Sequence, residues 1–137
     1  DRIDLQIDIP GVTAADLSLP ACLEGTAEAA ARVRAARDAQ TDRYKNDNMS
    51  VSTNAVVGGS VLDRVASPDQ PGRDLLAKAA DAMRLSARAY HRTLKVARTI
   101  ADLDGVDAIR RIHIAEALAY RRVEPNQEQQ AQMARAI

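Results

Sequence analysis

Small apolar residues recur at helical spacing through most of this sequence, and this pattern constrains the fold more than any other feature. It covers residues 26–44, 73–85, 86–103 and 111–122. In each stretch, residues three or four apart form one apolar stripe, as in a helix that buries a single face. Alanine fills many of these positions, and the 137-residue chain has no Phe or Trp. Because alanine forms helices well but buries little surface, the pattern predicts a mainly α-helical bundle with a thin core.

Residues 86–103 have the clearest boundaries of the four stretches. Ser86 belongs to the residue types that cap helix N-termini, and Asp104–Gly105 can end the helix with a left-handed residue. The stripe in the first helix has one polar exception, Gln40. The side chains expected to face the core are Ala29, Val33, Ala36 and Tyr44, then Leu75, Leu76, Ala79, Ala80 and Met83, then Tyr90, Leu94, Ala97, Ile100 and Ala101, and finally Ile112, Ala115, Leu118 and Ala119.

Two other regions lack this helical pattern. Asn, Ser, Gly and Pro punctuate residues 46–72, which predicts a flexible connector with at most one short turn at 61–65. The polar tail, 124–137, is compatible with either a helix or disorder. The resulting division is a first segment 1–25, a linker helix 26–45, the connector, a helical bundle 73–123 and the tail.

The first ten residues read as a single β-strand. Residues 3–9, "IDLQIDI", alternate apolar and polar side chains, and Pro10–Gly11 ends the pattern. A lone strand is unstable because its backbone groups need a neighbour. No partner strand is evident in the remaining sequence, so we expect the chain to be a fragment of a longer protein.

The charge and the cysteine content restrict the partners and the cellular compartment that we expect for the protein. Nineteen basic and nineteen acidic side chains cancel, so net charge does not draw the chain to nucleic acid or to an anionic membrane. Cys22 is the only cysteine, which excludes an internal disulfide and suits a reducing compartment. No apolar run approaches the ~20 residues of a membrane span. These features predict a cytoplasmic protein without a membrane partner.

Arg84, Arg88, Arg92 and Lys95 are spaced four, four and three residues apart. On a continuous helix they would form one positive stripe. Such a stripe is usually solvated, but arginine also binds phosphate well because its forked donors match phosphate oxygens. Spacing alone leaves both interpretations open for Arg88, which lies in the first turn.

Specific motifs carry a family resemblance. "LSARAYHRTLKVARTIADLDG", residues 85–105, closely resembles the C-terminal helices of the magnesium-chelatase-like AAA+ proteins known as ComM or YifB, which are akin to the I subunit of magnesium chelatase. "DRIDLQIDIP", residues 1–10, is similar to the family segment "DRIDLHVEVP". "AARVRAARDAQTDRY", residues 30–44, resembles the helix "RVxxARxxQxxR", and "IHIAEALAYRR", residues 112–122, the final helix. "NDNM", residues 46–49, departs from the family's "NARM" in having Asn48 in place of a basic residue.

The resemblance implies an AAA+ lid-type helical bundle preceded by the last strand of the ATPase core. Arg2 matches the arginine finger, which acts on the nucleotide of the neighbouring subunit, and Arg88 matches the sensor-2 arginine of the lid. The parent would use ATP and Mg²⁺. This chain lacks the G-x-x-x-x-G-K-[ST] phosphate loop and the paired acids that hold Mg²⁺, so alone it is expected to bind no cofactor and hydrolyse no ATP.

The implied partners are the N-terminal AAA+ core of the same protein, neighbouring subunits of a homo-hexamer, and DNA. The implied function is a motor that drives DNA branch migration. One alternative is the motor subunit that powers Mg²⁺ insertion into protoporphyrin. Another is a helical module that binds protein or nucleic acid and has no nucleotide role.

No metal site is expected from the sequence. His113 and Glu116 lie three residues apart on a helix, but a zinc site needs more ligands at defined spacing.

Overall fold

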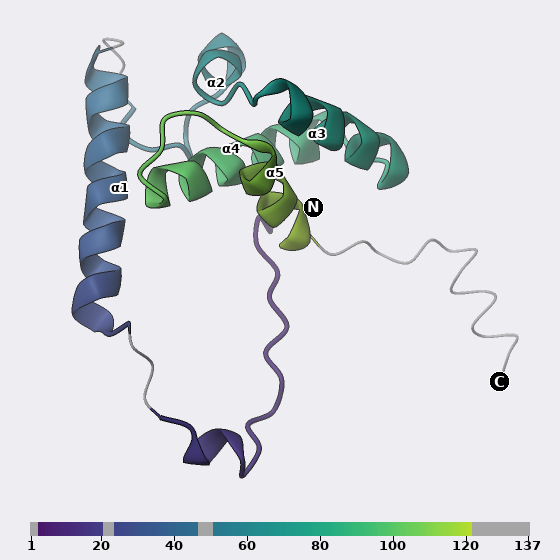
Figure 1. Cartoon of the computed structure of the whole chain (residues 1–137). Helices are drawn as coiled ribbons and strands as arrows, with labels where there is room; N and C mark the ends of the chain where they lie inside the picture. Colours follow the sequence, from purple (N-terminus) through teal and green to yellow (C-terminus); the bar gives the residue numbers. More distant parts are fainter. Residues whose placement is uncertain (1–2, 21–23, 47–50, 122–137) are drawn as a thin grey trace, which may run out of the picture.

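The computed structural model describes residues 3–20, 24–46 and 51–121, and it confirms a mainly α-helical chain (Figure 1). The 3-10 helix η1 spans Asp16–Ser18. The α-helices of these residues are α1 (Thr26–Asn46), α2 (Gly59–Val65), α3 (Gln70–Ala82), α4 (Ala87–Leu103) and α5 (Arg111–Ala119). None of the described helices is long and apolar enough to span a membrane.

Helix α4 lies at the centre of the fold. Helices α1, α2 and α5 pack on it, and α3 packs on α5. The core between them is thin, as the sequence predicts, because alanines supply several of its buried positions. The buried apolar residues of this core are Tyr44, Val57, Leu62, Ala66, Leu76, Leu94, Ala97, Ile100, Ala101, Ile109, Ile114 and Ala117.

Both ends of α4 are fixed by local hydrogen bonds that the sequence predicts. Ser86 Oγ accepts from the backbone N–H of Ala89 at 3.2 Å. At the other end Gly105 has a φ of +68°, and the N–H of Val106 donates to Ala101 O at 3.0 Å. This is the Schellman arrangement, in which a left-handed residue satisfies the last carbonyls of a helix. The position of α4 in sequence is therefore set by its own caps.

Replacing Ser86 with alanine should lower the free energy of unfolding by about 1 kcal/mol, because the first turn of α4 loses its side-chain acceptor. Urea unfolding of the variant beside Ser52→Ala, which alters an exposed serine outside the helices, measures the difference. Equal midpoints for the two variants would mean that the cap is not stabilising.

The turn between α3 and α4 also ends in a left-handed residue, but here it is an arginine. Arg84 has a φ of +48°. The N–H of Leu85 donates to Ala80 O at 2.9 Å, and the N–H of Arg84 donates to Asp81 O at 3.3 Å. Glycine is the usual residue at this position, since other side chains are strained there. The tight turn places the first residues of α4 directly after α3.

The region expected as a connector, 46–72, contributes to the core in its described part. It contains α2 and the first residues of α3. Asn54, Val57 and Leu62 are buried. The apolar residues Val57 and Leu62 are separated by Gly58, Gly59 and Ser60, so no periodic stripe marks them in the sequence. Burial here depends on contact with α4, to which α2 is packed.

The buried faces of α1 and α5 differ in part from the predicted stripes. Val33 is 51% exposed, and the buried residues of α1 begin with Ala36. The first half of α1 extends beyond the other helices of the bundle (Figure 1). In α5 the predicted residue Ile112 is 56% exposed, whereas His113 and Ile114 are buried. Ala115 and Ala119 are exposed as well. Helix α5 carries apolar residues on every side, so the pattern does not define which face packs.

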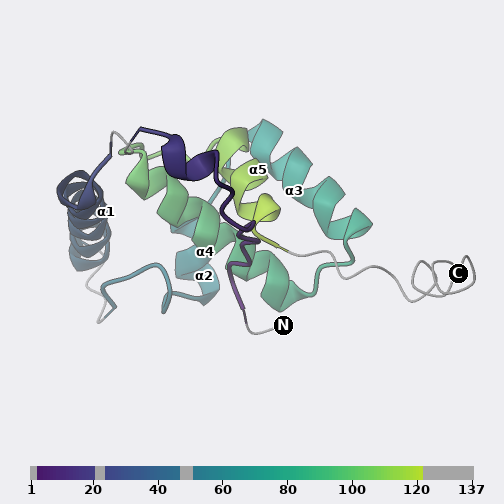
Figure 2. The ribbon, with the colours of Figure 1, turned by 90° about the horizontal axis from the view of Figure 1, so that it is seen from below.

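Residues 3–20 run beneath the bundle and away from it, with η1 near the far end (Figures 1 and 2). No strand forms within these residues, and all of their side chains are exposed. One backbone hydrogen bond, from Gln6 N–H to Tyr120 O at 2.8 Å, joins the segment to the bundle. The strand expected at residues 3–9 stays a prediction for the longer protein, in which a partner sheet would pair with it. Arg2, Cys22 and the tail 124–137 lie outside the described residues.

Candidate functional site

Arg88 lies in the first turn of α4, and its side chain is exposed. The Ser86 cap fixes the backbone of this turn. The free N–H groups and dipole of a helix N-terminus favour anions, and an exposed guanidinium adds a full positive charge. Arg88 is thus an exposed positive charge at the N-terminal end of α4.

Two other basic residues of the stripe, Arg92 and Lys95, make contacts that residues of a solvated helix face would not make. Arg92, one turn after Arg88, is partly buried and forms an ion pair with Asp4. Lys95 donates from Nζ to Ala55 O at 2.9 Å, which ties α4 to the loop before α2. Arg84 is exposed in the preceding turn. Arg92 and Lys95 thus make specific structural contacts that the stripe alone does not indicate.

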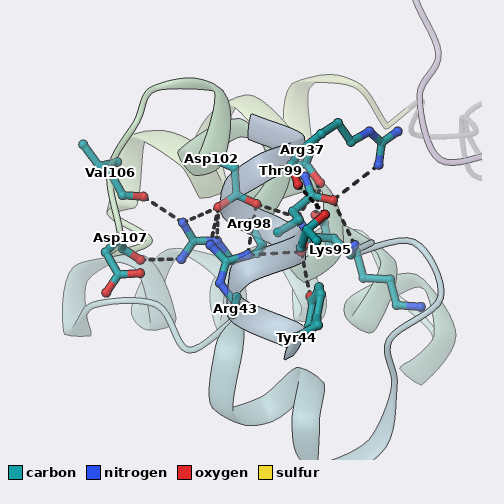
Figure 3. A network of polar contacts seen from close by, with 12 residues as sticks. Arg37, Arg43, Tyr44, Lys95, Arg98, Thr99, Asp102, Val106 and Asp107 are labelled. Carbon is teal, nitrogen blue, oxygen red and sulfur yellow. Dashed lines mark hydrogen bonds and ion pairs between the residues drawn. The ribbon is translucent and has the colours of Figure 1, made fainter. Parts of the chain in front are cut away.

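A buried polar cluster fastens α1 to the second half of α4 (Figure 3). We call it the Asp102 cluster. At its centre the carboxylate of Asp102 accepts from Arg43 Nη2 at 2.5 Å and Nη1 at 3.2 Å, a bidentate pair between the two helices. Arg98, one turn before Asp102, donates to the same carboxylate from Nε at 3.1 Å. The members of the cluster are Gln40, Arg43, Tyr44, Asn54, Arg98, Thr99 and Asp102.

Asn54, in the loop before α2, also donates a hydrogen bond to the Asp102 carboxylate. Its Nδ2 donates to Asp102 Oδ2 at 2.8 Å and to Thr99 Oγ1 at 3.0 Å. Its Oδ1 accepts from the Tyr44 hydroxyl at 2.7 Å. Its backbone N–H donates to Gln40 Oε1 at 3.2 Å. Asn54 therefore connects all three segments that meet at the cluster.

Arg98 extends the cluster to the loop after α4. Its Nη2 donates to Val106 O at 2.7 Å, and its Nη1 donates to Asp107 O. These carbonyls follow the Gly105 cap, so one guanidinium joins the end of α4 to the next loop. The buried charges are paired and hydrogen-bonded, which is the condition under which proteins tolerate them.

Burial and pairing act in opposite directions on the cationic groups of the cluster. Burial works to lower the pKa of Arg43, but the hydrogen bonds and charge of Asp102 outweigh it, so the pKa is raised. In Arg98 burial dominates and lowers the pKa, although Asp102 acts to raise it. Burial also raises the pKa of Tyr44, whose hydroxyl donates to Asn54 Oδ1.

Sequence reasoning missed the Asp102 cluster, although two signals for it exist. Gln40 is the polar exception on the apolar stripe of α1, and it is buried. Arg98 and Asp102 are four residues apart, a spacing at which opposite charges meet on one helix face. A polar residue inside an apolar stripe indicates a buried partner, but it does not identify Asn54 or Asp102 as that partner.

His113 makes structural contacts at the start of α5 and does not form a metal-binding pair with Glu116. His113 is buried, and its Nδ1 accepts from Arg110 N–H at 2.9 Å at the start of α5. Its Nε2 lies 3.2 Å from Asp104 Oδ2. Glu116 is exposed and accepts from the Tyr120 hydroxyl at 3.0 Å. Within the described ranges no three His, Cys, Asp or Glu side chains gather as they would around a metal ion.

Comparison with known proteins identifies the family. Residues 23–121 match the family model described as the C-terminal region of magnesium chelatase subunit ChlI. This chain belongs to that family. The match covers the helices described above, from α1 to the end of α5, and it confirms the resemblance read from the sequence motifs.

Two similar proteins illustrate the relationship. The competence protein ComM of Haemophilus influenzae is 36% identical over 122 residues, which cover 88% of this chain and 23% of that protein. The YifB protein of Escherichia coli is 35% identical over 127 residues, which cover 90% of this chain and 24% of that protein. The chain therefore spans about a quarter of the length of these relatives of the ChlI C-terminal family.

Proposed function

We propose that this chain is the C-terminal lid region of a magnesium-chelatase-like AAA+ ATPase of the ComM and YifB kind. In the longer protein it couples ATP binding and hydrolysis to the motion of a ring. The family match supports this role, as does the small share of each relative that the chain covers. The lid bundle spans residues 73–123 and the linker helix 26–45, whereas residues 1–25 belong with the core.

This proposal depends on the role of Arg88. It is the sensor-2 arginine, which contacts the phosphates of a nucleotide held by the core. The observation behind this assignment is an exposed guanidinium in the first turn of a helix whose far end is clamped by the Asp102 cluster. A phosphate that pulls on Arg88 would therefore move α4 and α1 together. Such rigid-body motion is how a lid relays nucleotide state.

The residues of this chain fit the phosphate part of the cofactor. Arginine offers forked N–H donors and keeps its charge, so Arg88 can neutralise phosphate oxygens. Bound ATP would supply the γ-phosphate, and Mg²⁺ would neutralise charge on the phosphates. The ligands for Mg²⁺ would come from the ATPase core. The chain alone would then hydrolyse no ATP.

Two partners follow from the same proposal. The core of the same protein would cover residues 3–9, whose apolar side chains Ile3, Leu5, Ile7 and Ile9 are 49–86% exposed. Pairing with a core sheet would bury these side chains and satisfy the backbone groups between them. Neighbouring subunits of a homo-hexamer would receive Arg2, the arginine finger. We propose DNA as the substrate of the ring and the cytoplasm as its location.

Replacing Arg88 with alanine in the whole protein should lower ATP turnover at least about tenfold, because one charge-assisted contact to the phosphates is lost. Arg111→Ala, which removes an exposed arginine from α5, is the matched control and should keep full turnover. Circular dichroism and gel filtration check that the variant folds and assembles. Unchanged turnover in an assembled Arg88→Ala ring would refute the sensor assignment.

A second candidate function is the motor subunit of magnesium chelatase. The description of the matching family model favours it, since that description names magnesium chelatase subunit ChlI. The two functions differ in the substrate on which the energy of ATP hydrolysis acts. Faster ATP turnover with branched DNA would support the DNA motor, and ATP-dependent metalation of protoporphyrin would support the chelatase.

A further inference from the structure

Arg121, which lies just after α5, joins the end of that helix to the first turns of α4. Helix α5 packs on α4 (Figure 2). Arg121 Nη1 donates to Ala89 O at 2.9 Å and to Thr93 Oγ1 at 3.4 Å. The Thr93 hydroxyl itself donates to Ala89 O at 3.0 Å. Because Ala89 and Thr93 are both buried, this contact belongs to the interface between the two helices.

The first turn of α4 depends on contacts of this kind, because a helix begins with N–H groups that have no partner within the helix. Ser86 satisfies one of them, since its Oγ accepts from Ala89 N–H at 3.2 Å. Its carbonyl accepts from Tyr90 N–H at 2.9 Å. These bonds act within the turn and do not fix the turn against the rest of the bundle. Arg121 supplies a bond that does.

Arg121 also lies beside the arginine stripe. Burial lowers the pKa of Arg121, and the charge of Arg92 lowers it further. Arg92 follows Arg88 by one helical turn, so the two are neighbours on the surface of α4. A partly buried guanidinium stays charged and needs hydrogen-bond acceptors, and the carbonyl of Ala89 is one of them.

The direction of the Arg88 side chain depends on where this turn lies. Arg88 directly precedes Ala89, so a shift of the Ala89 carbonyl away from α5 would move Arg88 with it. The far half of α4 is held to α1 through Asp102. A displacement of about 1 Å in a group that aligns a reaction can lower the rate on the order of a hundredfold. The position of this near end of α4 therefore matters for a phosphate contact.

We propose that Arg121 is a positioning residue for Arg88. By donating to Ala89 O it holds the first turn of α4 against α5, so that Arg88 meets the nucleotide phosphates in one orientation. This inference rests on the proposed function of Arg88. It does not require Arg121 to touch the nucleotide.

Arg121→Met in the whole protein should lower ATP turnover about fivefold, because the first turn of α4 loses a hydrogen bond to α5 while the unbranched side-chain stem is kept. Arg121→Lys keeps the charge and a donor for Ala89 O, so it should recover most of the turnover. Arg111→Met removes an exposed arginine from α5 and is the matched control, which should keep full turnover.

A double-mutant cycle separates positioning from direct contact with the nucleotide. If Arg121 acts through Arg88, then Arg121→Met added to Arg88→Ala should lower turnover no further. A residue that touched the nucleotide itself, or that only stabilised the fold, would lower turnover by the same factor in both backgrounds. Arg121→Gln, which keeps a polar side chain, takes the place of Arg121→Met in the cycle if the methionine variant does not assemble.

Hydrogen exchange measures the effect on the turn directly. In the Arg121 variant that enters the cycle, the amides of Ala89 and Tyr90 should exchange faster than in the wild type, because the turn opens more often. The amides of residues 99–103 should keep their protection, since the Asp102 cluster holds that end of α4.

The outcomes separate this inference from the proposed function. If Arg88→Ala lowers turnover but the Arg121 variant does not, or does so equally in both backgrounds, the positioning role is wrong and the sensor stands. Unchanged exchange at Ala89 and Tyr90 also overturns the positioning role. If Arg88→Ala leaves turnover unchanged, both proposals fall.

Discussion

Asp102→Ala should lower the free energy of unfolding by about 3–5 kcal/mol, the largest effect on stability that we expect from a single substitution. Asp102 is buried and accepts hydrogen bonds from Arg43, Arg98 and Asn54. Without this carboxylate the Arg98 guanidinium stays buried and loses the carboxylate to which it donates. Domains of this size are stable by roughly 5–15 kcal/mol, so the loss would remove a large share of the total stability.

Three further variants would test the reason for this effect. Asp38→Ala removes an exposed carboxylate from α1 and should shift the urea midpoint little. Asp102→Asn keeps the shape but loses the charge, so it should be intermediate. The triple variant Arg43→Met, Asp102→Leu, Arg98→Met should recover much of the stability, because it leaves no buried charge behind. A triple variant less stable than Asp102→Ala would show that the cluster stabilises by its net attraction instead.

The part of the fold that follows from local sequence was predictable. Helix α4 is bounded by Ser86 and Gly105, and both residues act through backbone groups within a few positions of themselves. Its buried residues Leu94, Ala97 and Ala101 follow one stripe, as expected. In α5 the predicted face was right only for Leu118, which packs against the core. Apolar residues surround the helix, and the neighbours α3 and α4 select the buried side.

The candidate site was predictable to a lesser degree. A motif resemblance points to Arg88, and its exposure at a helix N-terminus is a property of the capped turn. The partners of Arg92 and Lys95 were not predictable, because Asp4 and the carbonyl of Ala55 come from distant parts of the chain. The same applies to Asn54, whose loop gives no periodic signal. Contacts of this kind depend on how the helices pack rather than on spacing.

Arg2→Ala in the whole protein should lower ATP turnover by about a thousandfold or more, the largest effect on activity that we expect. An arginine finger stabilises the charge that develops on the transferred phosphoryl group, and its loss typically costs 10³–10⁵ in rate. Arg2→Lys keeps the charge but not the forked donors, so it should recover only part of the rate. Unfolding midpoints equal to those of the wild type would assign the loss to chemistry rather than to folding.

Mixing subunits tests whether the finger acts on a neighbour. Subunits with Arg2→Ala keep their own nucleotide site but give nothing to the next one. Subunits with a disabled phosphate loop keep Arg2 but hydrolyse nothing themselves. Each population alone should be inactive, whereas mixed rings should regain turnover wherever an intact Arg2 reaches an intact site. Mixed rings that assemble and stay inactive would contradict action in trans, because both halves of a working site would then be present without effect.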